Sequence, residues 1–402
     1  MPMTGRRWLA GAALAGLAAA TLSACGPSAT ALPAAGGSAD LPAVTARSFS
    51  MDFSQMRKLR AVTRLGSGKI GVLLPDTTTS PRYTEFDAPY LARALEAAGL
   101  SRSQFMITNA QGSDATEQAQ AQSDMTQGAT VLLLDPIDSG VGASIESAAA
   151  TLGVKVIDYD RMTLGGRRAY YVSFDNVAVG ALMARGLVTC IQAWHVGQPD
   201  VLVMRGAATD HNASLFARGY DRVLRPYFRS GRYASAGQPP GSWDPTTAQT
   251  TFEEQYTADN RITAVLTPND DTAGAVISYL KTLNTPPRSF PTTGQDATPA
   301  GLQNILAGYQ CGTVYKPIYL EAQAAAALAL YLRAGLTPPG SLVNERTYDP
   351  QGRAWVPSVL LRPVWVTARN IASTVVRDGF VPVALLCAGP LRAACRQAGI
   401  GG

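Results

Sequence analysis

From residue 69 onward, short apolar runs alternate with stretches of helical periodicity, and this alternation limits the folds open to the chain. Lys69 to Leu74 has the composition of a buried strand, and a helix is predicted from about Phe86 to Ala98, where Gly99 ends it. The predicted strands that follow are 104–109, 130–135 and 154–158, and the predicted helices between them are 114–127 and 141–152. Apolar strands that alternate with helices indicate a parallel sheet covered on both faces.

The same pattern starts again after the strand predicted over Tyr170 to Phe174, so the chain divides into two α/β units joined end to end. The second unit has predicted helices over 177–194, 212–224, 246–258 and 272–283, and predicted strands over 201–204, 262–266 and 313–315. About 335 residues follow the N-terminal region, more than one hydrophobic core usually holds. In such folds, ligands bind in the crevice at the carboxyl ends of the strands.

Residues 1–24 have the layout of a lipoprotein signal peptide. Arg6 and Arg7 supply the positive start, the apolar run Trp8 to Thr21 follows, and Leu22-Ser23-Ala24 places small residues before Cys25. The apolar run is shorter than the ~20 residues that a transmembrane helix needs. We therefore expect cleavage before Cys25 and lipidation of Cys25, which would hold the protein on the extracytoplasmic face of the cell membrane by a lipid anchor only. The alternative is an ordinary secretory signal with a chance cysteine.

Residues 25–68 are predicted to form a lipid-anchored, flexible tether. Gly26 to Ser38 is small, polar and interrupted by proline, and such a segment cannot bury enough surface to offset the entropy of ordering. Met51 to Leu65 carries more apolar and basic residues. Two interpretations of this part stay open, namely packing on the first unit and docking near acidic lipid headgroups.

The net charge argues against nucleic acid as a partner. The formal charge is +5, and loss of Arg6 and Arg7 with the signal would leave +3. No basic run interleaved with aromatic residues accompanies this small excess.

Four cysteines besides Cys25 are expected outside the cytoplasm, where disulfides form. They are Cys190, Cys311, Cys387 and Cys395. Three pairings are open, and the sequence does not choose among them, although a loop from Cys387 to Cys395 would be easy to close. Metal binding is disfavoured, because the chain has only two histidines and no CxxC spacing.

Polar side chains recur where the predicted strands end. Asp160 and Arg161 follow the fourth strand, and Lys316 follows the strand over 313–315. Carboxylates and basic groups can accept from and donate to the hydroxyls of a sugar, while an aromatic face covers the apolar side of its ring. Tyr83 and Trp243 are nearby aromatic residues in this pattern. The sequence therefore predicts a carbohydrate site at the strand ends.

Several of these residues also have a purely structural interpretation. Asn269 and Asp210 could cap the helices that follow them. Asp160 and Arg161 could form a surface ion pair. Trp243 could anchor its own loop.

Six short motifs together resemble those of the periplasmic monosaccharide-binding proteins of ABC importers, a group that includes D-xylose-binding proteins. The resemblance extends, in order, from about Lys69 to Phe380. The motifs are Tyr159-Asp160-Arg161-Met162, Ser173-Phe174-Asp175-Asn176, Asn212-Ala213-Ser214-Leu215-Phe216, Asn269-Asp270, Gly294-Gln295-Asp296-Ala297 and Val314-Tyr315-Lys316-Pro317.

The resemblance implies the type I periplasmic-binding-protein fold, in which two Rossmann-like lobes with parallel sheets are joined by a three-segment hinge and close on one sugar. It implies an N-terminal lobe of residues 69–174 and 317–340, a C-terminal lobe of residues 175–316 and 355–385, and a tail over 386–402. The implied ligand-binding residues are Arg82, Tyr83, Asp160, Arg161, Asn212, Trp243, Asn269, Asp296 and Lys316.

Three departures from the family pattern leave the sugar open among D-xylose, D-glucose, D-galactose and L-arabinose. The first loop lacks the usual charged cluster, Tyr83 stands where tryptophan is usual, and His211 stands where asparagine is usual.

The resemblance also implies that the protein delivers its sugar to ABC permease subunits with a cytoplasmic ATPase, as a monomer without a cofactor. An enzyme is disfavoured, because the chain has no GxSxG, no HExxH and no GxGxxG after its first strand. A transcription repressor of this fold would carry a helix-turn-helix in place of the signal. A receptor role stays open, in which the sugar-closed form docks on a sensor kinase or chemoreceptor.

Overall fold

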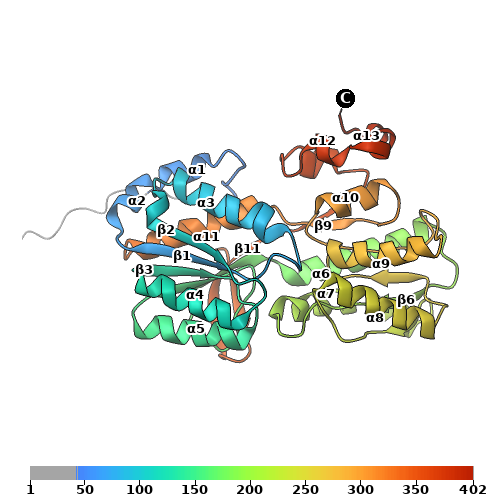
Figure 1. Cartoon of the computed structure of the whole chain (residues 1–402), viewed down its shortest axis with the longest axis horizontal. Helices are drawn as coiled ribbons and strands as arrows, with labels where there is room; N and C mark the ends of the chain where they lie inside the picture. The colour runs from blue at the N-terminus through green and yellow to red at the C-terminus, as the bar shows by residue number, and fades with distance from the viewer. Residues whose placement is uncertain (1–41, 43, 402) are drawn as a thin grey trace, which may run out of the picture. The chain divides into compact units, whose positions relative to one another are not determined.

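The computed structural model divides into two units, Met1–Asp40 and Leu41–Gly402 (Figure 1). The structure describes residues 42 and 44–401, all of which belong to the second unit. The predicted signal peptide and Cys25 lie outside the described residues. The described chain forms two α/β lobes, each with parallel strands and covering helices. The predicted fold class is confirmed.

A seven-stranded sheet forms the centre of the first lobe. Its strands run in the order β10-β11-β5-β4-β3-β1-β2, and all neighbours in it are parallel except β10 and β11. The parallel pairing brings the carboxyl ends of the central strands to one edge of the sheet. The strands are β1 (Lys69–Leu74), β2 (Phe105–Asn109), β3 (Ala129–Leu134), β4 (Lys155–Tyr159), β5 (Tyr170–Phe174), β10 (Glu345–Asp349) and β11 (Ala354–Leu361).

Helices cover both faces of this sheet. α4 (Asp114–Thr126) and α5 (Ser139–Thr151) pack on one face, and α3 (Ala88–Ala97) and α11 (Ile318–Arg333) pack on the other (Figure 1). The central strands are therefore buried on both sides, which explains apolar runs without alternation, as in β3. Two short helical turns, η1 (Tyr83–Asp87) and η2 (Arg102–Gln104), precede α3 and β2.

Residues 44–65 pack on the first lobe, so the prediction of a tether over 25–68 is wrong for this segment. It forms α1 (Ser54–Lys58) and α2 (Arg60–Leu65), which contact α3 and α11 respectively. Its apolar side chains are buried in the main core, and they include Val44, Phe49, Phe53, Met56, Leu59 and Val62. Of the two interpretations of residues 51–65, packing on the lobe is the one that the structure supports.

The second lobe is built on a smaller sheet. β6, β7 and β8 form a parallel group in the order β7-β6-β8, and isolated bridges link it to the antiparallel pair β9 and β12. Val201 and Val203 pack toward α6 and α7, whereas Leu202 packs toward α8 and α9. The bounds are α6 (Asn176–Ala193), β6 (Asp200–Val203), α7 (His211–Arg229), β7 (Ala234–Gly237), α8 (Pro245–Ala258), β8 (Ala264–Leu266), α9 (Asp270–Thr282), α10 (Pro299–Leu306), β9 (Thr313–Tyr315) and β12 (Val364–Val366).

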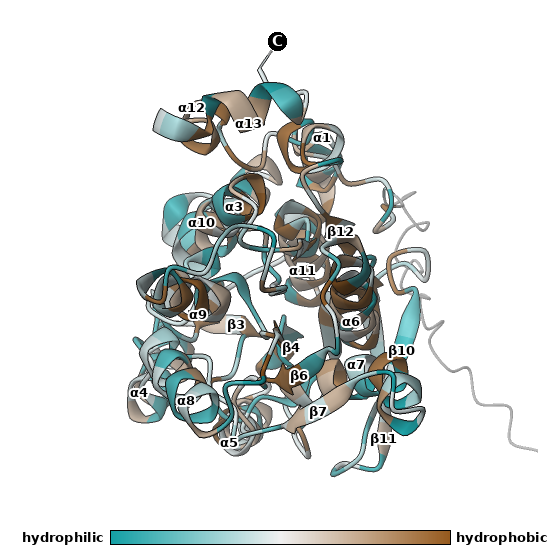
Figure 2. Ribbon diagram, turned by 90° about the vertical axis from the view of Figure 1, so that its right-hand side faces the viewer, coloured by the Kyte–Doolittle hydropathy of each residue, from teal (hydrophilic) through white to brown (hydrophobic). Residues whose placement is uncertain are grey.

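α6 and α7 approach closely because each carries a glycine at the contact. A Cβ at Gly180 would collide with the backbone of Phe216, and a Cβ at Gly219 would collide with the backbone of Val177. α6 is mostly apolar (Figure 2) and by length and composition could cross a membrane, but 61% of it is buried within the lobe. The close contact places the start of α7 beside the start of α6.

The chain passes between the lobes three times, from β5 into α6, from β9 into α11 and from β11 into β12. The third crossing comes later than predicted, because β11 pairs with β5 in the first lobe. The assignment of residues 355–385 to the second lobe is therefore wrong for 355–361. An apolar strand such as β11 suits either sheet. It pairs with β5, with Ser358 opposite Tyr171, and these two strands lie far apart in sequence.

Beyond β12 the chain forms a small cap on the second lobe. Its elements are η3 (Ala372–Val376), α12 (Val383–Leu386), η4 (Gly389–Leu391) and α13 (Arg392–Gln397). Among the described residues, disulfides join Cys190 to Cys311 and Cys387 to Cys395, which is one of the three open pairings. α12 contacts α10, so the second disulfide closes a cap that packs on this lobe.

Candidate functional site

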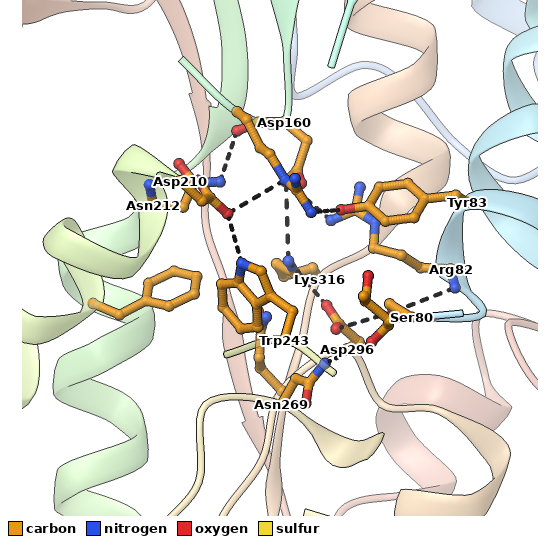
Figure 3. A pocket seen from close by; sticks show the side chains of 14 residues that line it. Ser80, Arg82, Tyr83, Asp160, Asp210, Asn212, Trp243, Asn269, Asp296 and Lys316 are labelled. Atoms are coloured by element: carbon orange, nitrogen blue, oxygen red, sulfur yellow. Dashed lines mark hydrogen bonds and ion pairs between the residues drawn. The ribbon is translucent and has the colours of Figure 1, made fainter. Parts of the chain in front are cut away.

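A polar pocket lies between the two lobes at the carboxyl ends of their strands (Figure 3). The structure brings all nine predicted ligand-binding residues into its lining: Arg82, Tyr83, Asp160, Arg161, Asn212, Trp243, Asn269, Asp296 and Lys316. Its lining side chains pair with one another between the lobes.

Two buried carboxylates enter the pocket from residues with left-handed backbone. Asp160 follows β4 with φ of 57°, and Asp296 follows the bridging residue Gln295 with φ of 92°. Aspartate adopts this region more readily than most residues other than glycine. Lys316 Nζ lies 2.9 Å from Asp296 Oδ1 and 4.0 Å from Asp160 Oδ1. The lysine therefore stands between an acid of the first lobe and an acid of the second.

Arg82 is the buried cation of the first loop. Its Nη1 donates to Asp160 at 2.9 Å, its Nε and Nη2 donate to Asp87 at 2.9 and 2.7 Å, and Nη2 also donates to Glu321 at 3.0 Å. Burial opposes the charge, but the carboxylates of Asp160 and Asp87 hold the pKa of Arg82 well above its ordinary value. Burial would raise the pKa of Asp160, yet Arg82 and then Lys316 lower it below its ordinary value. The pocket therefore holds a charged carboxylate fixed by a charged arginine.

Arg161 connects the two lobes through carboxylates on both sides. Its Nε lies 3.5 Å from Asp135 of the first lobe and 3.3 Å from Asp210 of the second, and its Nη2 donates to the Tyr83 hydroxyl at 2.9 Å. Burial raises the pKa of Asp135 well above its ordinary value, and Asp160 adds to this effect. Arg161 is thus a buried pocket residue, so its interpretation as half of a surface ion pair with Asp160 is wrong.

Asn269 caps a helix, as one interpretation of the sequence expected, and it also reaches the first lobe across the pocket. Its Oδ1 accepts a hydrogen bond from the Thr272 backbone N–H at 2.9 Å and so caps α9. Its Nδ2 donates to the carbonyl oxygen of Thr79, in the first lobe, at 3.1 Å. The side-chain amide of Asn212 likewise crosses between the lobes, because its Nδ2 donates to the Asp160 carbonyl at 3.0 Å.

Trp243 presents an aromatic face whose position is set by three neighbours. Its Nε1 donates to Asp210 Oδ2 at 3.2 Å, and its ring meets Phe216 edge to face at 6.2 Å between centroids. A Cβ at Gly206 would collide with the indole, so only glycine allows the ring to lie as it does. Tyr83 is fixed in a similar way, since the Arg161 guanidinium lies 5.7 Å from its ring centroid.

Five further residues line the pocket and were not among the predicted ligand-binding set. They are Thr79, Ser80, Asp210, Phe216 and Gln295. The sequence carried a signal for three of them, because Asp210 comes after the predicted strand over 201–204, Gln295 lies within one of the family-like motifs and Phe216 ends another. Thr79 and Ser80 lie in a polar loop whose path into the pocket no local pattern indicates.

The α/β lobes, their three connections and the polar pocket between them define a two-lobed solute-binding protein. Residues 70–337 match the family described as periplasmic binding protein domain. The chain belongs to this family, and the recognition made from its motifs is confirmed.

Curated relatives and solved structures agree with this assignment. The D-xylose-binding periplasmic protein of Escherichia coli (strain K12) is 35% identical over 315 residues, covering 78% of this chain and 90% of that protein. The multiple sugar-binding periplasmic receptor ChvE of Rhizobium radiobacter is 31% identical over 331 residues, covering 78% of this chain and 90% of that protein. The carbohydrate transporter solute binding protein from Chloroflexus aurantiacus, in complex with D-glucose, superposes with a TM-score of 0.71 at 30% identity, covering 79% of this chain and 97% of that one.

Proposed function

We propose that this chain is an extracytoplasmic solute-binding lipoprotein of an ABC sugar importer, which captures a monosaccharide, D-xylose or a similar aldose, between its lobes and delivers it to the permease. One observation carries the proposal. Charged hydrogen-bonding groups from both lobes converge, in a buried pocket, around Lys316 and beside the indole of Trp243. The names of the relatives, which include D-xylose and multiple sugars, point to the same class of ligand.

The chemistry of the lining suits a neutral ligand with many hydroxyl groups. A hydroxyl can donate to Asp296 while it accepts from Lys316, and so can replace the direct ion pair between them at 2.9 Å. Hydrogen bonds with a charged partner contribute about 1.5–3 kcal/mol each. The face of Trp243 can cover the apolar side of the ring. A hydroxyl missing from the ligand would leave a buried charge unpaired, which gives a basis for selectivity.

Because the charged side chains that line the pocket are almost fully buried, a sugar can enter only when the lobes move apart. On binding, it would exchange the contacts among the side chains for contacts with its own hydroxyls. Because Asp160 belongs to the first lobe and Asn212 and Asp296 to the second, a bound sugar favours the arrangement in which both sets reach it. A ligand shifts a conformational equilibrium by its differential affinity for the two states, and the permease with its cytoplasmic ATPase would recognise the closed form.

The same proposal places the mature protein on the membrane as a monomer, held by lipid on Cys25. A second candidate function is sensing, in which the closed form docks on a sensor kinase or chemoreceptor. It is favoured by one observation, that a relative of 31% identity is named a receptor.

Isothermal titration of the full chain with single sugars tests the binding step. We expect saturable binding of at least one of D-xylose, D-glucose, D-galactose and L-arabinose, and a thermal stabilisation that grows with sugar concentration, reaching about 2.7 kcal/mol at 100 times Kd. A matched sugar alcohol, such as xylitol for D-xylose, serves as the control, since it has the hydroxyls but no ring. Absence of a response to any monosaccharide would end the sugar-binding proposal.

A further inference from the structure

A second concave site, here called the arginine groove, lies on the second lobe between α6, α10 and the turn after β12. Its volume is about 630 Å³, within the range of small-molecule sites. It shares no lining residue with the pocket between the lobes. Nothing in the proposed sugar-binding role requires it.

Three arginines from separate segments line the groove: Arg185 on α6, Arg288 in the loop after α9, and Arg369 in the turn after β12. All three are exposed, and none of them takes part in an ion pair within the described part of the chain. No aspartate or glutamate is among the lining residues. The groove is therefore a cationic site without a counter-charge of its own.

The walls between these arginines are apolar and aromatic. Trp365 and Trp194 both line the groove, with aliphatic side chains from α6 and α10. A Cβ at Gly186 or at Gly312 would collide with the indole of Trp365, so two glycines shape the surface on which this ring lies. Flat aromatic surfaces of this kind favour stacking or edge contacts with another ring.

A disulfide joins two of the segments that line the groove, which form two of its sides. Cys190 lies on α6 and Cys311 lies in the segment before β9, and both line the groove. The bond joins residues 121 positions apart in sequence. The arrangement of the two sides is thus set before any ligand arrives, which lowers the cost of binding.

We propose that the arginine groove binds a small aromatic carboxylate. Its ring would lie against Trp365 and its carboxylate would be bound by the guanidinium groups, which match that group in bidentate geometry. An inorganic anion would make no use of the tryptophans, and a neutral sugar would leave the three cations without a counter-charge. The arginines and the tryptophans together therefore select a ligand that is both anionic and aromatic.

Calorimetric titration of the full chain with 1-naphthaleneacetate, and with the neutral 1-naphthaleneacetamide, tests the proposal. We expect saturable binding of one carboxylate per chain, at least tenfold tighter than binding of the amide. The double variant Arg185→Gln/Arg369→Gln should weaken carboxylate binding roughly tenfold or more, because charge-assisted hydrogen bonds are lost. Arg225→Gln, which removes an exposed arginine of α7 on the same lobe, should leave it unchanged.

Three results would overturn the proposal: no saturable binding of the carboxylate, equal binding of the amide, or wild-type affinity in the double variant. Binding of a hexaglutamate peptide without binding of naphthaleneacetate would also overturn it, and would make the groove a docking surface for an acidic protein segment. Aldose titration of the double variant keeps the two sites distinct, since its sugar affinity should equal that of the wild type whatever the outcome at the groove.

Discussion

Replacing Asp296 with asparagine should weaken sugar binding without disturbing the fold. The Asp296 side chain is almost fully buried, and its carboxylate lies 2.9 Å from Lys316 Nζ and 3.5 Å from Ser80 Oγ. Asparagine keeps the shape and tolerates the left-handed backbone at φ of 92°, whereas alanine would add strain there. The change removes the charge, and the nearest remaining carboxylate to Lys316 would be Asp160 at 4.0 Å.

The expected loss follows from the difference between charged and neutral hydrogen bonds. That difference is roughly 1–2 kcal/mol, which corresponds to about a 5- to 30-fold rise in Kd. Alanine at the same position would leave Lys316 without its close partner, and we expect a cost of about 2–5 kcal/mol. The order of affinities should therefore be wild type, then Asp296→Asn, then Asp296→Ala.

Titration calorimetry measures the affinity of each variant, and small-angle scattering with and without sugar measures lobe closure as a fall in the radius of gyration. Asp221→Asn is the matched control, because Asp221 lies on α7 outside the pocket and its carboxylate is 3.8 Å from Arg205. This variant should bind sugar as the wild type does. Normal affinity in Asp296→Asn and Asp296→Ala would remove the residue from the site, and an unchanged radius of gyration at saturating sugar would refute closure.

Three further outcomes are expected. Cys25→Ser should release the protein from the membrane fraction or leave the precursor uncleaved; wild-type protein that is wholly secreted and free of lipid by mass spectrometry would contradict the anchor. Serine in place of both Cys190 and Cys311, whose bond spans 121 positions, should cost about 5 kcal/mol of unfolding free energy, against about 2.5 kcal/mol for loss of the tail disulfide, which spans 8 positions. Thermal unfolding should therefore show the larger loss of stability in the Cys190/Cys311 variant. A larger loss in the tail variant would count against loop closure as the cause. Burial raises the pKa of Glu117 from 4.5 to about 8, so the folded protein keeps a proton that the unfolded chain releases, and the unfolding free energy should fall as pH rises between these values. Glu117→Gln should flatten that part of the pH profile in urea unfolding, and an unaltered profile would disprove the assignment.

The lobes could be predicted because their signals are local. The apolar run predicted as a strand over Lys69 to Leu74 is β1, and the run predicted over 130–135 is β3 shifted by one residue. Since parallel strands end at a common edge, polar residues after such strands were expected to meet. This reasoning was enough to predict that Asp160 and Lys316 lie in one pocket, and the family resemblance added Asp296.

The parts that could not be predicted depend on contacts between distant segments. The helices α1 and α2 are short, and only the surface of α3 and α11 gives their apolar side chains a place to be buried. Glu321, which accepts a hydrogen bond from Arg82, is 239 residues away from it in sequence. The strand β11 could suit either lobe until its neighbour is known. No periodicity or spacing within a short window records such pairings.

Under the proposed function, the cap that Asn269 forms limits how this protein can change its specificity. The same side chain caps α9 through its oxygen and reaches Thr79 across the pocket through its nitrogen. A substitution that altered recognition there would also remove a cap worth about 1 kcal/mol, so stability and selectivity cannot drift independently at this position. Trp243 carries no such cap, and its ring is held by Asp210, Phe216 and the close approach of Gly206. Divergence toward new sugars, whether by natural variation or by directed evolution, should therefore accumulate around Trp243 long before it reaches Asn269.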